Sequence, residues 1–175
     1  MSGTLIIATS ALLAPLAVIV SYYDVRYRRI PNVLVLTALI SGLAINAIIG
    51  GVNGLLTSLG GCALAFGLML LLHIFGAMGA GDVKLFAAIG SVLGAGLILP
   101  TFLVVALTGG ALAIYSMLRA GTVSATMFRV LQIFVGMLPG WEMPCFAVPA
   151  DKRHTIPYGV AITFGSLISV FVFRA

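Results

Sequence analysis

The chain has 175 residues, of which 62% are hydrophobic and 7% are charged, and its formal net charge is +5. A soluble domain carries about 25% charged residues, so this composition excludes an ordinary soluble domain and predicts an integral membrane protein. In such a protein an excess of Lys and Arg reports membrane topology rather than nucleic-acid binding, and the expected surroundings are a lipid bilayer.

The first half of the chain divides into three apolar stretches, each near the 20 or so residues that cross a bilayer. The first predicted span covers 4–22, and we expect it to be retained because it is too long for the apolar core of a signal peptide. The charged segment DVRYRRIPN (24–32) separates it from a second span at 32–49. An uncharged turn, GGVNG (50–54), leads to a third span at 55–75.

The stretch between Asp82 and Arg119 allows two divisions. Two short spans at 83–97 and 100–118 fit its length, with Pro100 opening the second. A single span followed by a re-entrant segment also fits.

A more polar segment, 119–156, comes before the last predicted span at 160–173. Within it, residues 125–138 have the pattern of a short helix. This helix is expected either to lie along the membrane interface or to be partly buried in a loop.

Basic residues decide between the two divisions, because Lys and Arg collect on the cytoplasmic side of membranes. With six spans, only Arg174 lies on the far side. The others share the cytoplasmic side: Arg26, Arg28, Arg29, Lys84, Arg119, Arg129, Lys152 and Arg153. We therefore predict one all-α domain, residues 1–175, that is a polytopic bundle of six transmembrane helices in the cytoplasmic (inner) membrane, with both termini outside.

Two of the four acidic residues border predicted spans. Asp24 follows the first span and Asp82 precedes the fourth, so the six-span topology places both at one depth on the cytoplasmic side. An acid beside the hydrocarbon is a candidate functional group. Two neighbouring carboxyl groups do not both ionise easily, so such a pair can take a proton from water and also donate a hydrogen bond to a carbonyl.

The alternative is that each aspartate forms an ion pair with a basic neighbour in sequence, Asp24 with Arg26 or Arg28 and Asp82 with Lys84. Ion pairs leave unexplained the glycines ahead of Asp82, which are Gly76, Gly79 and Gly81. Glycine permits backbone conformations and close approaches that other residues do not. We expect this flexible segment to receive an unwound, extended substrate strand.

At this point the sequence resembles a known family. Residues 79–82, Gly-Ala-Gly-Asp, resemble the GxGD motif of intramembrane aspartyl proteases, and DVRYRRIPN with GAGDVKLFAAIG resembles the prepilin peptidases, which include preflagellin peptidases. The resemblance implies an aspartic endopeptidase with Asp24 and Asp82 as the catalytic pair. It also implies membrane-anchored prepilin-like substrates, cut behind a short basic leader at the cytoplasmic face.

The sequence departs from parts of the family pattern. Large members carry a cytoplasmic domain with paired CxxC motifs that methylates the new N-terminus, and this chain has no such domain or motif. It therefore resembles small peptidase-only members such as those serving Tad/Flp-type pili, and no methyltransferase activity is expected. In IPYG (156–159), Val160 follows where the family's P-Y/F-G-P element often has a second proline, which weakens any role for that element.

No metal or organic cofactor is expected. The two cysteines, Cys62 and Cys145, form no CxxC motif, and His73 and His154 are far apart in sequence, so a structural zinc site is not predicted.

Five further residues are candidates for substrate binding: Arg26, Arg29, Pro31, Asn32 and Lys84. The arginines either anchor the topology or contact the substrate near the cut. Lys84 either lowers the pKa of Asp82 or extends to the interface. Asn32 either caps the second span or orients Asp24.

Two other functions remain open. One is a GxGD protease with another substrate, such as preflagellin or another membrane-anchored precursor. The other is a small transporter or assembly subunit, which would bind a cation through polar groups in mid-span. The sequence also leaves open the oligomeric state and the separation of Asp24 and Asp82 before a substrate binds.

Overall fold

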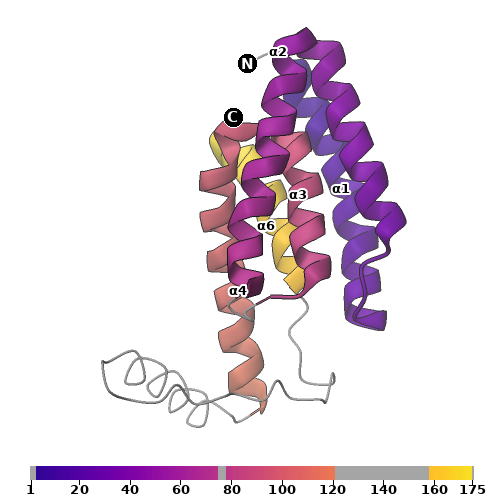
Figure 1. The fold of residues 1–175 in the computed structure, drawn as a ribbon. Helices are drawn as coiled ribbons and strands as arrows, with labels where there is room; N and C mark the ends of the chain where they lie inside the picture. Colours follow the sequence, from indigo (N-terminus) through magenta and orange to yellow (C-terminus); the bar gives the residue numbers. More distant parts are fainter. Residues whose placement is uncertain (1–2, 75–77, 121–157, 175) are drawn as a thin grey trace, which may run out of the picture. The chain divides into compact units, whose positions relative to one another are not determined.

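A computed structural model describes residues 3–74, 78–120 and 158–174. Every element in these residues is a helix (Figure 1), which confirms the predicted all-α class for this part of the chain. The elements are α1 (Gly3–Tyr27), α2 (Asn32–Ile74), α3 (Ala80–Leu93), the short 3-10 helix η1 (Ala95–Leu97), α4 (Ile98–Ala120) and α6 (Tyr158–Arg174). The helix predicted at 125–138 lies outside the described residues.

Within the part of the chain that the structure describes, three helical segments are long and apolar enough to cross a membrane: α1, α2 and Ala95–Ser116. The protein is therefore a membrane protein, whereas the number of six spans stays a prediction. The apolar part of α6, Tyr158–Phe173, is shorter. α3 has 14 residues, and a helix of that length rises about 21 Å, less than the roughly 30 Å of a hydrocarbon core.

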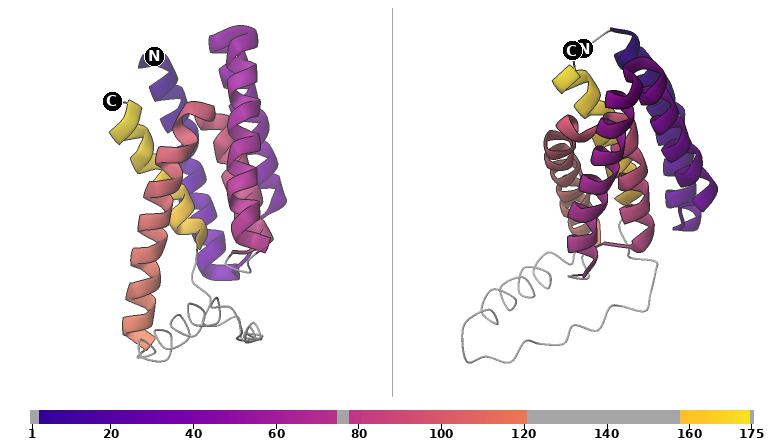
Figure 2. Two further views of the ribbon diagram at one scale, coloured as in Figure 1. Left: turned by 60° about the vertical axis from the view of Figure 1, so that its left-hand side comes forward. Right: turned by 45° about the horizontal axis from the view of Figure 1, so that its top comes forward.

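Helix α2 reverses direction at Gly51, which has a φ of 58° and a ψ of −143°. Beyond the turn, Gly54 lies so close to the carbonyl of Asn46 that a side chain at 54 would collide with it. Figure 2 shows the two arms of α2 side by side. They cover the predicted spans at 32–49 and 55–75.

Two predicted helix ends differ from the structure. α1 continues to Tyr27, so Asp24 lies inside the helix rather than in a loop after it. α3 ends at Leu93 rather than at 97, because Gly94 takes a φ of 76° that a helix cannot continue through. Apolar length predicts the membrane-embedded part of a helix, while its ends depend on local backbone geometry.

The chain divides into two compact units, residues 1–109 with 157–175, and residues 110–156. The first unit holds α1, α2, α3, α6 and the first part of α4. The described part of the second unit is the end of α4, which exposes Ile114 and Tyr115.

Helix α3 is the centre of the first unit, since every residue from Leu85 to Leu93 is buried. Glycines let both arms of α2 approach it. A Cβ on Gly42 would lie 2.8 Å from the side chain of Val92, and a Cβ on Gly61 would collide with the carbonyl of Gly90. Small residues at such contacts allow the close backbone packing on which membrane helix pairs depend.

A buried polar cluster fixes α3 between the arms of α2. The side chains of Asn46 and Ser58 both donate to the carbonyl of Ser91, at 2.9 and 2.6 Å. The Ser91 hydroxyl lies 3.2 Å from the carbonyl of Leu39. Because an unpaired polar group is costly in hydrocarbon, these bonds set the position of α3 along α2.

Helix α6 packs against α1 and against the first part of α4. A hydrogen bond of 2.7 Å joins the hydroxyls of Thr101 and Ser169. At Gly165, a Cβ would lie 3.0 Å from the side chain of Val105. The start of α1 and the end of α6 lie at the same end of the unit (Figure 1).

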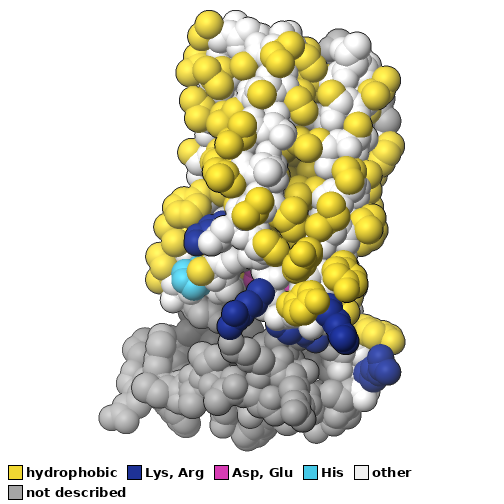
Figure 3. Space-filling view, turned by 90° about the vertical axis from the view of Figure 1, so that its right-hand side faces the viewer, with side chains coloured by type: hydrophobic (Ala, Val, Ile, Leu, Met, Phe, Trp, Pro, Cys, Tyr) yellow, Lys and Arg dark blue, Asp and Glu magenta, His cyan; other side chains and the backbone are white. Residues whose placement is uncertain are grey.

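The other end of this unit carries the basic segment that follows Asp24. The three arginines of the segment after Asp24 are exposed, and they are Arg26, Arg28 and Arg29. Figure 3 shows Lys and Arg side chains gathered near this end, while the rest of the visible face is largely hydrophobic. This distribution agrees with a bundle embedded in a bilayer with one basic interface.

Candidate active site

Asp24 lies near the end of α1 and is 8% exposed. Its Oδ2 accepts a hydrogen bond from the backbone N–H of Gly159 at 2.7 Å. Gly159 is the second residue of α6, and the first N–H groups of a helix have no partner within the helix and carry partial positive charge. The start of α6 therefore provides a donor and a favourable dipole for the Asp24 carboxylate.

Asp82 lies in the first turn of α3 and is partly buried. Its Oδ2 accepts a hydrogen bond from the N–H of Gly79 at 3.3 Å. Burial and, to a smaller extent, the charge of Asp24 raise the pKa of Asp82 to about 6, against the lowering effect of the Gly79 bond. The side chain of Lys84 is exposed, and its predicted effect on the pKa of Asp82 stays a prediction.

The structure brings the two aspartates to one end of the first unit. Asp24 and Asp82 interact electrostatically, although they come from different helices. The six-span topology predicts this juxtaposition. Two nearby carboxyl groups do not both ionise easily.

Helix α1 ends at Tyr27, and the chain leaves it through Arg28, whose backbone is strained. The N–H of Arg28 donates to the carbonyl of Asp24 at 3.1 Å, and Arg28 has a φ of 52°. This left-handed cap is usually a glycine, and a side chain there costs roughly 1–2 kcal/mol. The Arg28 charge also acts favourably on the Asp24 carboxylate. Arg28 is one of the two arginines that the ion-pair alternative names for Asp24, and that alternative stays a prediction.

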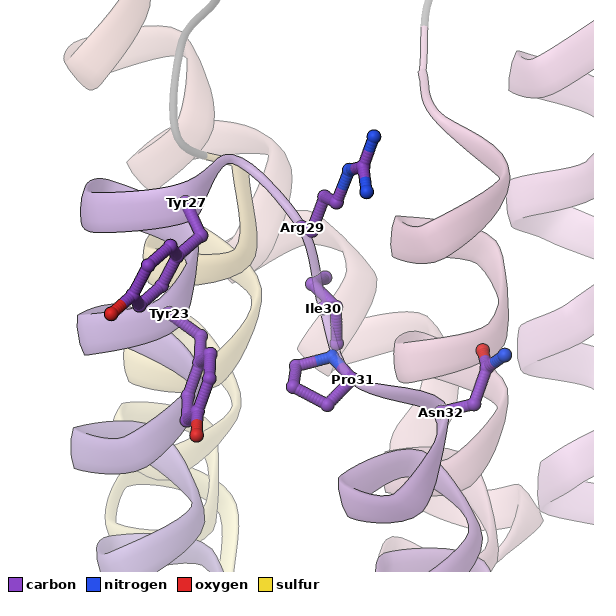
Figure 4. Close-up of a pocket in the computed structure, with 6 residues that line it drawn as sticks. All are labelled: Tyr23, Tyr27, Arg29, Ile30, Pro31 and Asn32. Carbon is purple, nitrogen blue, oxygen red and sulfur yellow. The ribbon is translucent and has the colours of Figure 1, made fainter.

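A groove of about 460 Å³ lies along the segment that joins α1 to α2. Tyr23 and Tyr27 are stacked on α1 with ring centroids 5.6 Å apart. The lining residues, drawn in Figure 4, are Tyr23, Tyr27, Arg29, Ile30, Pro31 and Asn32. Three of the predicted substrate-binding residues therefore share one groove, and Arg26 is not among its lining residues.

For the glycines ahead of Asp82, the expected reception of an extended substrate strand stays a prediction. Gly76 lies outside the described residues. Neither Gly79 nor Gly81 has a positive φ, so this conformation does not need glycine's backbone freedom. A Cβ on Gly79 would lie 3.3 Å from Oδ2 of Asp82, so close approach to the carboxylate is what the structure supports at that position.

Sequence reasoning missed two residues of the site. Gly159 binds Asp24, and the neighbouring Tyr158 lies within electrostatic range of Asp82. The signal in the sequence is the IPYG element (156–159), in which Val160 follows where the family often has a second proline. The two roles expected for Asn32, capping the second span or orienting Asp24, stay predictions.

No group of three or more His, Cys, Asp or Glu that could hold a metal occurs within residues 3–74, 78–120 and 158–174. The arrangement offers acid–base chemistry by two carboxyl groups. Asp24 has one oxygen held by the Gly159 N–H, and Asp82 has a pKa raised to about 6, so it holds a proton up to a higher pH than an ordinary aspartate.

Comparison with known proteins gives one match. The family model of the type IV leader peptidase family matches residues 11–114, a stretch that includes both aspartates. No curated protein and no solved structure shows significant similarity to the chain. Because the match covers more than half of the chain, the protein belongs to the type IV leader peptidase family.

Proposed function

We propose that the protein is an intramembrane aspartic endopeptidase that removes the short leader from type IV-like prepilins at the cytoplasmic face of the membrane. The observation that carries the proposal is that Asp24 and Asp82 lie at the basic end of the first unit, near enough for the charge of Asp24 to raise the pKa of Asp82. Both residues fall within the match to the leader peptidase family.

The environments of the two carboxyl groups support different tasks. Burial disfavours the ionised form of Asp24, while the Gly159 N–H and the Arg28 charge favour it. In the proposed reaction, ionised Asp24 takes a proton from the attacking water. Asp82, with a pKa near 6, keeps a proton more readily and donates a hydrogen bond to the scissile carbonyl. After water adds to the carbonyl carbon, the proton passes to the leaving amine and the carbon–nitrogen bond breaks.

The groove along the segment that joins α1 to α2 suits a peptide substrate. Its aromatic wall, Tyr23 and Tyr27, suits apolar side chains, and Arg29 offers a donor to backbone carbonyls of an extended strand. This chemistry needs no metal or organic cofactor, and methyl transfer is not part of the proposal.

Co-expression with a candidate prepilin tests the function. The wild-type chain is expected to convert the prepilin to a faster-migrating form that lacks its leader, whereas the empty vector leaves it uncut. A preflagellin tested in parallel separates the alternative substrate class. An uncut prepilin, with the enzyme present in the membrane fraction, would contradict the proposal.

A further inference from the structure

The contact between α6 and Asp24 is too close for any side chain. Gly159 is buried, and a Cβ placed on it would lie 2.8 Å from Oδ2 and 3.1 Å from Cγ of Asp24. Cβ atoms in proteins essentially never approach other atoms within 3.0 Å. Gly159 has no positive φ, so the requirement for glycine comes from close approach and not from backbone conformation.

The helices on both sides of this contact are packed against their neighbours. On one side, Asp24 is fixed within the buried face of α1. On the other side, α6 is held against α4 by the Thr101–Ser169 hydrogen bond of 2.7 Å and by a bond of 3.3 Å from Thr108 to the carbonyl of Ala161. A side chain at 159 would therefore displace the carboxylate itself.

We propose that Gly159 is the positioning residue of Asp24, because its N–H fixes Oδ2 and its missing side chain lets the start of α6 close over the carboxylate. This role rests on the proposed function. With Oδ2 held, Oδ1 is left to take the proton from water. Tyr158 in the same turn lies within electrostatic range of Asp82, so one turn of α6 faces both members of the pair.

The kinetic test compares two glycines. In Gly159→Ala, leader removal by the purified enzyme should lose at least tenfold in kcat, with KM within twofold of wild type, because substrate binding uses other residues. The matched control is Gly67→Ala, since a Cβ at 67 meets nothing within 4 Å. Its kcat should equal that of the wild type. A wild-type kcat in Gly159→Ala would overturn the proposal.

A second test measures the contact between Gly159 and Asp24 without any substrate. Gly159→Ala should lower the apparent Tm of the purified protein by roughly 3–8 °C, as expected for overpacking at a site with no free space. In an Asp24→Ala background the same substitution should cost less than half as much, because Oδ2 and Cγ are gone. Equal losses in both backgrounds would overturn the contact.

The two tests separate this inference from the proposed function. If the wild type cleaves and Asp24→Asn does not, an active Gly159→Ala contradicts only the positioning role. A wild type that cleaves no prepilin contradicts the proposed function and the catalytic role of Gly159 with it, even where the Tm coupling between residues 24 and 159 is found.

Discussion

At the scale of single residues, two carboxyl groups are held by glycine N–H groups. Gly159 binds Asp24 and Gly79 binds Asp82, and in each case a Cβ would crowd the carboxylate, at 2.8 and 3.3 Å from Oδ2. Backbone donors without side chains can sit close to an acid and still leave its second oxygen accessible. The glycines near the aspartates thus act through proximity.

The raised pKa of Asp82 predicts how stability depends on pH. Its folded value of about 6 exceeds the ordinary value of 3.8, so the folded protein binds more protons than the unfolded chain between these values. The stabilisation is full below about pH 4 and is lost as pH rises through 6. Asp82→Asn removes this dependence.

Asp82→Asn should therefore be more stable than the wild type at pH 7.5, by about 1–3 kcal/mol in the free energy of unfolding. The difference should vanish near pH 4. Thermal unfolding of both proteins in the same detergent at the two pH values measures it. A wild type that gains stability relative to the variant on going from pH 4 to 7.5 would show that the pKa of Asp82 is not raised.

The sequence alone predicts that the two aspartates lie at the same membrane depth, because span boundaries and the distribution of Lys and Arg place each of them on the cytoplasmic side. The hydrogen-bond partner of Asp24, the Gly159 N–H, could not be predicted in this way. Its bond to Gly159 joins positions 135 apart in the chain, and it depends on how closely α6 packs on α1. A sequence motif such as IPYG indicates which residues belong to the site, but it does not indicate which atom of Asp24 they contact.

At the scale of helices, α3 matters most, because it carries Asp82 and lies between the arms of α2. It is too short to cross a bilayer alone, and its burial comes from glycine contacts and from the hydrogen bonds that meet at Ser91. The sequence predicts the apolar stretch and the reversal at 50–54. It does not predict the end of α3, which is set by the left-handed Gly94.

Gly61→Ala tests this packing. The added methyl would collide with the carbonyl of Gly90, so α3 and the second arm of α2 would have to separate, at a cost of roughly 1–3 kcal/mol in the free energy of unfolding. Gly67→Ala in the same arm meets open space and should be neutral or slightly stabilising, because alanine favours helix. Paired thermal unfolding measures both, and equal Tm values for the two variants would refute the close contact.

At the scale of the whole molecule, composition was enough to predict a membrane protein, because so few charged residues cannot cover a soluble fold. The basic side was predicted from the positions of Lys and Arg along the chain. The charged segment after Asp24 and the start of α3 lie at one end of the first unit, as the positive-inside argument requires. Helix–helix contacts were not predictable, since they depend on backbone approach at Gly42, Gly61 and Gly165 rather than on apolar periodicity.

The central claim is that both aspartates perform the cleavage, and its most direct test is leader removal by purified Asp24→Asn and Asp82→Asn beside the wild type, scored by mass spectrometry. Loss of one acid–base group costs about 10²–10⁴-fold in rate, so each variant should fall at least about 10²-fold below the wild type while remaining folded in the membrane. Cleavage by either variant at the wild-type rate would contradict the account.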